Sequence, residues 1–278
     1  MKILVTGANG YLGQGVTKEL LKHKNIEVIA TDFSVNHVDE RANRVTANLF
    51  EITDPYNFFE KPDCVIHLAW RDGFKHSSLN HIHDLPLHYE FLKRLAESGI
   101  GQMVIMGSMH EIGFFEGSIS ETTPTNPQSL YGISKNALRQ SVELLEKEHG
   151  FCLQWLRGFY IVGNSEYGCS IFSKITEAHN KGQKEFPFTL GQNQYDFLNY
   201  DVFCQQVVAC ALQKEITGII NCCSGRPLKL AERVENFISE NNYDITLLYG
   251  AFPDRPYDSK AIWGNDDKIR AIMDKYQY

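Results

Sequence analysis

The sequence of 278 residues lacks several features that would assign it to a special class of protein. No segment approaches the roughly 20 apolar residues of a membrane span. The apolar start stops at Thr6 and Gly7, which is too short for a signal peptide. The seven cysteines show no CxxC or zinc-type spacing, and the net charge of −7 offers no basic surface to nucleic acid. We therefore expect a reduced, cytoplasmic protein that binds neither nucleic acid nor a membrane.

The sequence does contain a regular alternation of short apolar runs and longer helical patterns. The predicted strands are residues 2–6, 27–32, 64–69, 103–107, 153–158 and 218–222. The predicted helices are residues 13–23, 87–98, 129–149, 172–181, 201–214 and 230–241, with a charged helix in the tail. Strands separated by helices form βαβ units, and such units build a parallel sheet covered on both faces. The pattern predicts an α/β protein with a Rossmann-type doubly wound parallel sheet and a small mixed α/β substrate-binding lobe.

The segment TGANGYLG, residues 6–13, joins the first strand to the first helix. Glycines at 7, 10 and 13 permit a tight turn and close approach of a pyrophosphate to the helix N-terminus. Asp32 closes the second strand about 20 residues on, where a carboxylate binds ribose hydroxyls and repels a 2′-phosphate. The predicted cofactor is NAD or NADP, with Asp32 favouring NAD and nearby Arg41 and Arg44 leaving NADP open. The alternative role for Asp32 is that of a strand-end cap.

The segment SLYGISK, residues 129–135, places Tyr131 and Lys135 four residues apart, on one face of a helix. The phenol has an ordinary pKa near 10, and a neighbouring ammonium lowers it toward the range useful for proton transfer. Ser108 ends the apolar strand that begins at Met103, where it would orient a reacting oxygen. We predict that these three residues are catalytic. The alternative is that the tyrosine and the lysine lie on an exposed helix surface and have no catalytic role.

These motifs resemble the extended short-chain dehydrogenase/reductase superfamily and its NAD-dependent epimerase/dehydratase family. Four further segments resemble that family: HLAW (67–70), LRGFYIVG (156–163), NQYDFLNYDV (193–202) and GIINCCSGRPLKL (218–230). The last two are typical of the nucleotide-sugar branch, which contains 4-ketoreductases and epimerases. The resemblance implies a nucleotide-linked sugar as substrate and a homodimer built from helices of the nucleotide domain.

The resemblance also implies which residues form the sites. The implied cofactor contacts are Gly7, Asn9, Gly10, Tyr11, Leu12, Gly13, Asp32, Leu68, Ala69, Tyr131 and Lys135. The implied substrate contacts are Trp70, Met109, His110, Tyr160 and Tyr195. Residues 1–163 and 197–223 would form the dinucleotide-binding domain, and residues 164–196 and 224–278 the substrate-binding lobe. The histidines between 67 and 88 lack the helical spacing and carboxylate partner of a metal site, so no metal is expected.

Several positions depart from the family pattern. Met109 and His110 stand where 4,6-dehydratases carry Asp-Glu, and a thioether donates no proton, which disfavours a dehydratase. An imidazole with a pKa near 6.5 suits proton transfer, so His110 is a fourth catalytic candidate; alternatively it only hydrogen-bonds the substrate. Tyr195 replaces the arginine that commonly grips the diphosphate, and Tyr160 replaces an asparagine.

Three functional hypotheses follow from the sequence. The first is an NAD(P)-dependent reductase of a nucleoside-diphosphate 4-keto-6-deoxyhexose, with hydride delivered to C4 and Tyr131 as proton donor. The second is a nucleotide-sugar 4-epimerase that retains NAD. The third is a non-catalytic NAD-binding regulatory protein, which the intact Ser108, Tyr131 and Lys135 argue against.

Overall fold

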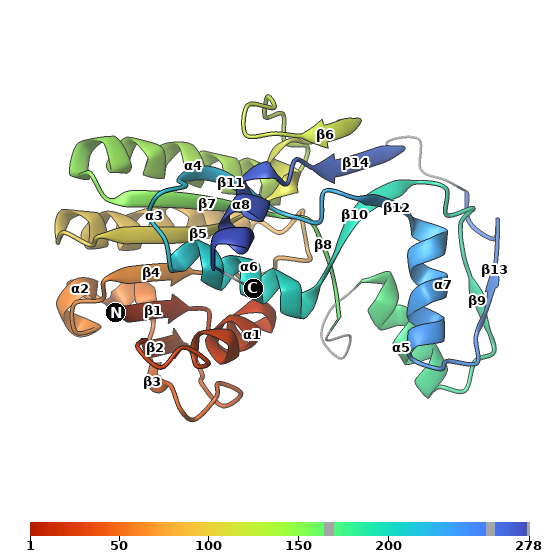
Figure 1. The fold of residues 1–278 in the computed structure, drawn as a ribbon, viewed down its shortest axis with the longest axis horizontal. Helices are drawn as coiled ribbons and strands as arrows, with labels where there is room; N and C mark the ends of the chain where they lie inside the picture. Colours follow the sequence, from red (N-terminus) through yellow and green to blue (C-terminus); the bar gives the residue numbers. More distant parts are fainter. Residues whose placement is uncertain (164–169, 254–258, 277–278) are drawn as a thin grey trace.

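A central sheet of seven strands organises the protein in a computed structural model, which describes residues 1–163, 170–253 and 259–276 (Figure 1). The strands are β1 (Lys2–Thr6), β2 (Glu27–Asp32), β3 (Asn43–Thr46), β4 (Cys64–His67), β5 (Gln102–Ser108), β7 (Cys152–Gly158) and β11 (Gly218–Cys222). Their order is β11-β7-β5-β4-β1-β2-β3, and every neighbouring pair is parallel.

Helices cover both faces of this sheet. On one side lie α1 (Tyr11–Leu20), α6 (Tyr200–Ala211) and α8 (Asp267–Tyr276), and on the other α2 (Pro55–Phe58), α3 (Asn80–Glu97) and α4 (Leu130–His149). Alternate side chains of a strand point to opposite faces. Ile3 of β1 accordingly packs in one cluster with Val16 of α1, and Leu4 packs in the other with Leu92 of α3. The predicted Rossmann-type doubly wound sheet is confirmed.

A second, mixed sheet and two further helices form the smaller part of the molecule. The second sheet contains β6 (Gly117–Ile119), β8 (Tyr160–Val162), β10 (Gln194–Asn199), β12 (Pro227–Lys229) and β14 (Ala261–Gly264). Beyond it lie β9 (Glu185–Pro187), β13 (Thr246–Leu248), α5 (Ile171–Asn180) and α7 (Leu230–Glu240), at the end farthest from α2 (Figure 1). Two short 3-10 turns, η1 (Leu49–Glu51) and η2 (Met109–Glu111), complete the elements.

One element differs from the sequence predictions in a way that matters for the site. Helix α3 begins at Asn80, seven residues before the predicted start, because it continues through Pro86. Proline breaks helices by removing a donor and crowding the preceding turn, so the sequence favoured a start after it. The tail helix α8 packs against α6 and β11, on the sheet domain. The division into residues 1–163 with 197–223 and 164–196 with 224–278 stays a prediction, and residues 164–169 and 254–258 lie outside the described part.

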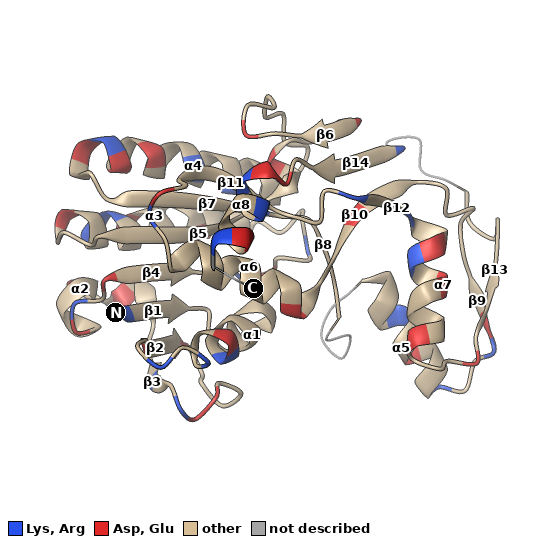
Figure 2. Ribbon diagram, in the orientation of Figure 1, with Lys and Arg blue, Asp and Glu red and all other residues tan. Residues whose placement is uncertain are grey.

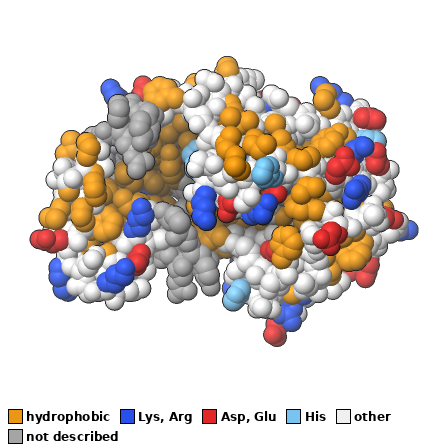
Figure 3. Space-filling model, turned by 180° about the vertical axis from the view of Figure 1, so that it is seen from behind, with side chains coloured by type: hydrophobic (Ala, Val, Ile, Leu, Met, Phe, Trp, Pro, Cys, Tyr) orange, Lys and Arg blue, Asp and Glu red, His pale blue; other side chains and the backbone are white. Residues whose placement is uncertain are grey.

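The strand order reverses between β1 and β4, which places a crevice beyond their carboxyl ends. Thr6 of β1 lies beside His67 of β4 in the sheet register. Ligands of open α/β sheets bind in the crevice at such a reversal. The surface is hollowed between the sheet domain and the smaller part of the molecule, with hydrophobic side chains along the hollow (Figure 3).

Charged residues of both signs lie along the outer turns of α3, α4 and α7 (Figure 2). Within the described ranges, no helix combines the length and the apolar character needed to cross a membrane. The described residues also contain no group of three or more His, Cys, Asp or Glu side chains placed to hold a metal ion.

Candidate active site

The glycine loop between β1 and α1 is shaped for close approach of a backbone or ligand. Gly7 has φ +69°, and a Cβ there would lie 2.6 Å from the backbone nitrogen of Ala69. A Cβ on Gly13 would lie 2.1 Å from the carbonyl oxygen of Gly7. Gly10 is the N-cap of α1 and has no side chain to satisfy the first N–H groups of the helix. These free donors fit the pyrophosphate of a dinucleotide.

Asp32 lies beside this loop, and two backbone N–H groups hold its carboxylate in place. Its Oδ2 accepts a hydrogen bond from the Asn9 N–H at 3.1 Å, and its Oδ1 accepts one from the Phe33 N–H at 2.7 Å. The Asn9 side chain accepts from the His37 N–H at 2.8 Å, which fixes the far side of the loop. A carboxylate with two oxygens retains lone pairs for ribose hydroxyls after these bonds.

The other predicted cofactor contacts surround the same loop. Leu68 donates its N–H to the carbonyl of Thr6 at 3.2 Å, which keeps the segment after β4 next to the end of β1. The Tyr11 hydroxyl donates to the carbonyl of Gly163 at 2.7 Å, and Leu12 packs on the core below α1. The chain segments at 7–13, 32 and 68–69 therefore converge as the sequence predicted they would.

Replacing Gly7 with alanine is expected to weaken NAD binding by about tenfold to a hundredfold, because the new Cβ would push the loop away from Ala69 and force an unfavourable φ. Gly99 provides the matched control, since its φ is +87° and nothing lies within 4 Å of a Cβ built there. Calorimetric titration with NAD would compare the two variants. Equal loss of affinity in both would contradict the close-approach argument.

Ser108, Tyr131 and Lys135 come together at the carboxyl end of β5. Ser108 ends that strand, and Tyr131 lies in the first turn of α4, where the Ser108 hydroxyl acts to lower the pKa of its phenol. Lys135 is one turn further along α4; it is 3% exposed, and its Nζ donates to the carbonyl oxygen of Met106 at 2.7 Å. The backbone N–H of Tyr131 donates to the carbonyl of His76 at 3.0 Å, so the loop before α3 covers the start of α4.

The electrostatics of this trio differ from the sequence expectation. Burial raises the pKa of Tyr131 to about 12, and the hydrogen bond from Ser108 opposes that rise only in part. Burial lowers the pKa of Lys135 to about 7, opposed by the carboxylate of Glu111. Burial outweighs the lowering of the phenol pKa expected from the neighbouring ammonium, whose Nζ is bonded to Met106 and lies 6.0 Å from the centre of the Tyr131 ring. At neutral pH the phenol is a protonated hydrogen-bond donor.

His110 and His76 form an imidazole pair beside Tyr131. Their ring centres lie 4.3 Å apart, and the His76 ring stacks on the Tyr131 ring at 5.1 Å with an angle of 10° between the planes. Burial lowers the pKa of His110 to about 4 and also lowers that of His76. Both rings are therefore neutral at pH 7. The sequence analysis weighed His76 only as a metal ligand, and a histidine in a polar loop carries no signal of its contacts.

The predicted substrate residues fall into two groups. Trp70 and Met109 lie with the trio: the Trp70 ring centre is 6.3 Å from that of Tyr131, and Met109, 7% exposed, follows Ser108 directly. Tyr160 of β8 and Tyr195 of β10 instead pair with each other in the second sheet, with ring centres 4.6 Å apart. Among the ring contacts of the described residues, none joins this tyrosine pair to Tyr131.

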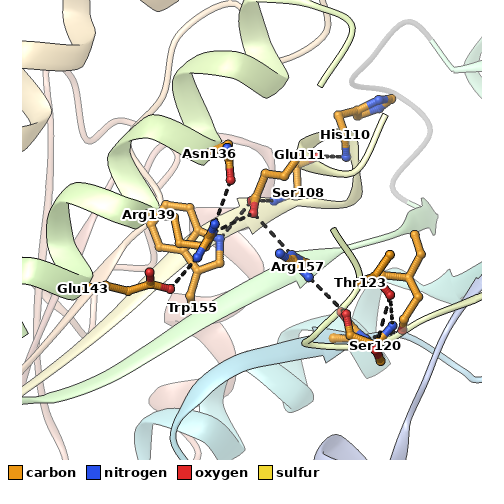
Figure 4. A network of polar contacts seen from close by, with 12 residues as sticks. Ser108, His110, Glu111, Ser120, Thr123, Asn136, Arg139, Glu143, Trp155 and Arg157 are labelled. Atoms are coloured by element: carbon orange, nitrogen blue, oxygen red, sulfur yellow. Dashed lines mark hydrogen bonds and ion pairs between the residues drawn. The ribbon is translucent and has the colours of Figure 1, made fainter. Parts of the chain in front are cut away.

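Glu111 is the structural centre of the site and was missed by the sequence analysis. Its carboxylate is fully buried; Oε1 accepts from the Ser108 N–H at 2.7 Å and from Trp155 Nε1 at 2.9 Å. Oε2 lies 3.3 Å from Arg157 Nε and 3.6 Å from Arg139 Nε (Figure 4). Ser108 in turn caps η2, which completes a reciprocal capping box with Glu111. This network fixes the end of β5 and hence the position of the Ser108 hydroxyl.

Comparison with known proteins gives one family and several relatives. The profile of the NAD dependent epimerase/dehydratase family matches residues 3–223. A dTDP-6-deoxy-L-talose 4-dehydrogenase (NAD(+)) of Aggregatibacter actinomycetemcomitans is 39% identical over 95% of this chain and 99% of its own length. An uncharacterized UDP-glucose epimerase of Bacillus subtilis is 28% identical over 77% of this chain and 73% of its own.

Two solved structures share the fold. A UDP-glucose 4-epimerase of Thermotoga maritima with UDP-glucose gives a TM-score of 0.82 at 20% identity, covering 98% of this chain and 92% of its own. A UDP-glucuronic acid 4-epimerase of Bacillus cereus, in complex with UDP-glucuronic acid and NAD, gives a TM-score of 0.82 at 21% identity, covering 99% and 93%.

Proposed function

This chain belongs to the NAD dependent epimerase/dehydratase family, as its motifs predicted, and on that premise we propose a specific reaction. The protein is an NAD-dependent oxidoreductase that interconverts the C4 hydroxyl and C4 ketone of a nucleoside-diphosphate 6-deoxyhexose. The observation that carries the proposal is the convergence of Ser108, Tyr131 and Lys135 at the carboxyl end of β5, beside the glycine loop.

The substrate class is taken from the relative that matches nearly the whole chain. Its name specifies a dTDP-linked 6-deoxy sugar, oxidation at position 4 and NAD(+). A dehydrogenase catalyses the reverse reaction as well, so the same site reduces a 4-keto-6-deoxyhexose. The 4-epimerases among the relatives and fold neighbours give the alternative, in which the C4 ketone forms only transiently on the enzyme.

NAD, when bound, supplies a hydride acceptor or donor; the loop from Gly7 to Gly13 and Asp32 would hold it. In the reductive direction Tyr131 gives its Oη proton to the forming C4 alkoxide, and its raised pKa keeps that proton available at neutral pH. The Ser108 hydroxyl holds the same substrate oxygen. A charged Lys135 stabilises the phenolate left behind, because opposite charges favour each other in a buried site.

His110 and Met109 would line the sugar pocket. The neutral His110 imidazole offers one donor and one acceptor, which suits recognition of a sugar hydroxyl. The same imidazole accepts a proton if the substrate is also epimerised beside the ketone. Tyr160 and Tyr195 form an aromatic pair in the second sheet, and we assign that pair to the nucleotide end of the substrate.

The coenzyme is proposed to be NAD rather than NADP, and a substitution of Asp32 tests this choice. In Asp32→Asn the side chain keeps an acceptor near the Asn9 N–H but no longer repels a 2′-phosphate. The ratio of kcat/KM for NAD to that for NADP is expected to fall about tenfold or more. Glu40→Gln, at an exposed position of the following loop, is the control and should leave the ratio unchanged. An unchanged ratio in Asp32→Asn would refute the assignment.

Two further properties follow as proposals. Six described cysteines are unpaired thiols, five of them buried, which suits the reducing cytoplasm.

The outer surfaces of the adjacent helices α3 and α4 expose Ile82, Leu87 and Leu144, and we propose that two copies pair through them. In sedimentation experiments the protein should be a dimer that Leu144→Asp weakens, whereas Leu190→Asp, outside α3 and α4, should not. A monomer at all concentrations would exclude this assembly.

The experiment that tests the reaction follows the absorbance of NADH in both directions. With dTDP-6-deoxy-L-talose and NAD, NADH should appear; with a dTDP-4-keto-6-deoxyhexose and NADH, it should disappear in proportion to product. Conversion of an NDP-hexose without net change in NADH would instead establish the epimerase. Binding of NAD without turnover of any nucleotide sugar would overturn both enzyme proposals.

A further inference from the structure

The Trp70 side chain packs between Lys135 and a group of buried histidines. The Nζ of Lys135 lies 3.9 Å from the centre of the Trp70 ring, which is within the range of a cation–π contact. The His88 ring stacks on the Trp70 ring at 4.6 Å with 17° between the planes. The indole Nε1–H donates to Nδ1 of His81 at 3.0 Å, which prevents the ring from turning.

The histidines beneath Trp70 are neutral and fixed in place. His88 shares a hydrogen bond of 3.0 Å with His67, whose other nitrogen bonds the hydroxyl of Thr6 at 2.8 Å. Burial lowers the pKa of His67 to about 3 and that of His88 well below its usual value. His67 and His88 therefore carry no charge at neutral pH, and the hydrogen bonds from His88 to His67 and from His67 to Thr6 hold both rings in place.

We propose that Trp70 is a positioning residue for Lys135, whose ring face holds the ammonium against the Met106 carbonyl and favours its charged form. The face of an indole ring is electron-rich, so it attracts a cation most strongly where water is excluded. Lys135 is buried, and burial alone disfavours the charge that the proposed proton transfer needs. Trp70 offsets part of that penalty. The inference rests on the proposed function of Lys135, which it deepens.

Other groups around Lys135 also favour or oppose its charged form. Glu111, from η2, favours the ammonium, while the neutral phenol of Tyr131 lies on the same helix. His67 of β4 and His88 of α3 would oppose the ammonium only if they were protonated, and burial lowers the pKa of both, so both are neutral near neutral pH. The groups that favour the charged lysine near neutral pH are therefore the Glu111 carboxylate and the Trp70 ring.

The direct test measures the titration of Lys135 by nuclear magnetic resonance of the cofactor-free protein labelled with [15N]lysine. Lys135→Gln identifies the signal by its loss. In Trp70→Leu, which keeps apolar bulk without a ring face, the Lys135 midpoint should fall by about one pH unit. In Trp70→Phe, which keeps a ring face but not the bond to His81, the midpoint should fall by less than half as much. An unchanged or raised midpoint in Trp70→Leu, or equal shifts in both variants, would overturn the proposal.

A second measurement avoids any change in packing. Growth on 5-fluorotryptophan withdraws electron density from every indole ring, so the Lys135 midpoint should fall in the wild-type chain. The same labelling in the Trp70→Leu background removes Trp70 as a cause, and there the midpoint should stay where it is. The comparison in the wild-type chain needs no substituted protein, and an unmoved midpoint there would overturn the proposal. A fluorine effect that persists in Trp70→Leu would assign the shift to Trp155 or Trp263 and contradict the proposal.

Kinetics separates a positioning role from direct contact with the sugar. In the reductive assay, the pH above which kcat falls should move down in Trp70→Leu by the same amount as the resonance midpoint, with KM for the nucleotide sugar changed less than about twofold. A large rise in KM with an unmoved pH profile would make Trp70 a substrate contact instead. If no nucleotide sugar turns over, the proposed function fails, while the resonance midpoint still decides the role of Trp70.

Discussion

Tyr131→Phe is expected to lower kcat for both oxidation and reduction by about 10²–10⁴-fold, the range that a positioned acid or base contributes. The phenol is buried against Ser108, and its raised pKa makes it a proton donor throughout the neutral range. Phenylalanine keeps the ring that stacks on His76 but has no proton to give. The variant should fold normally, because it removes a single hydroxyl and keeps the packing of the ring.

The measurement is the initial rate with NADH and a dTDP-4-keto-6-deoxyhexose, together with calorimetric titration of NAD. NAD affinity should remain within about threefold of the wild-type value. Tyr89→Phe removes the same atom from a half-buried tyrosine of α3 and should leave kcat unchanged. A Tyr131→Phe enzyme with more than a tenth of the wild-type kcat would show that another group transfers the proton.

Glu111→Gln is expected to lower the free energy of unfolding by about 3–5 kcal/mol, because it leaves buried guanidinium groups without their counter-charge. The Arg157 side chain is 1% exposed and bonds Oε2 of Glu111, while Arg139 adds a longer ion pair (Figure 4). Such a loss is a large share of the roughly 5–15 kcal/mol by which folded proteins are stable. Urea unfolding, read from the midpoint at an unchanged slope, measures it.

Glu143→Gln is the matched control, since Glu143 also pairs with Arg139 but its side chain is 34% exposed. A partly exposed pair contributes about 1 kcal/mol or less, so this variant should unfold close to wild type. Glu111→Gln should also reduce kcat, because the amide oxygen no longer attracts the arginines that hold the capping box at Ser108. Equal stability of Glu111→Gln and Glu143→Gln would contradict the claim that the buried Glu111 carboxylate stabilises the fold through its arginine partners.

The parts of the site that could be predicted are those whose residues are close in sequence. The loop from Gly7 to Gly13 follows a strand and precedes a helix, so local spacing alone indicates its use. Tyr131 and Lys135 are one helical turn apart, and that separation survives any arrangement of the other elements. Ser108 was predicted because a strand that turns polar at its end meets the ligand edge of a parallel sheet.

The parts that were missed depend on contacts between distant segments. Glu111 binds Arg157 and Trp155, more than 40 residues away, although the pattern Ser108-x-x-Glu111 is that of a capping box and gave a local signal. Helix α3 runs through Pro86, so His81 lay in a predicted loop and its hydrogen bond with Trp70 was not foreseen.

The second sheet was foreseen only as a mixed lobe. Its strands are mostly three residues long, too short for a clear alternation of apolar and polar residues. Strand β6 at Gly117–Ile119 pairs with β14 at Ala261–Gly264, a pairing of segments that no local pattern joins. Pairing over so long a separation is set by the packing of the whole fold.

The most direct test of the proposed reaction follows deuterium from NADH to the sugar. The protein is incubated with a dTDP-4-keto-6-deoxyhexose and NADH labelled with deuterium at C4 of the nicotinamide, and the product is read by nuclear magnetic resonance. The proposed reaction predicts one deuterium at C4 of the sugar for each NADH oxidised, incorporated about 10²–10⁴-fold more slowly with Tyr131→Phe. Sugar conversion without deuterium at C4 and without net oxidation of NADH would contradict it and identify an epimerase.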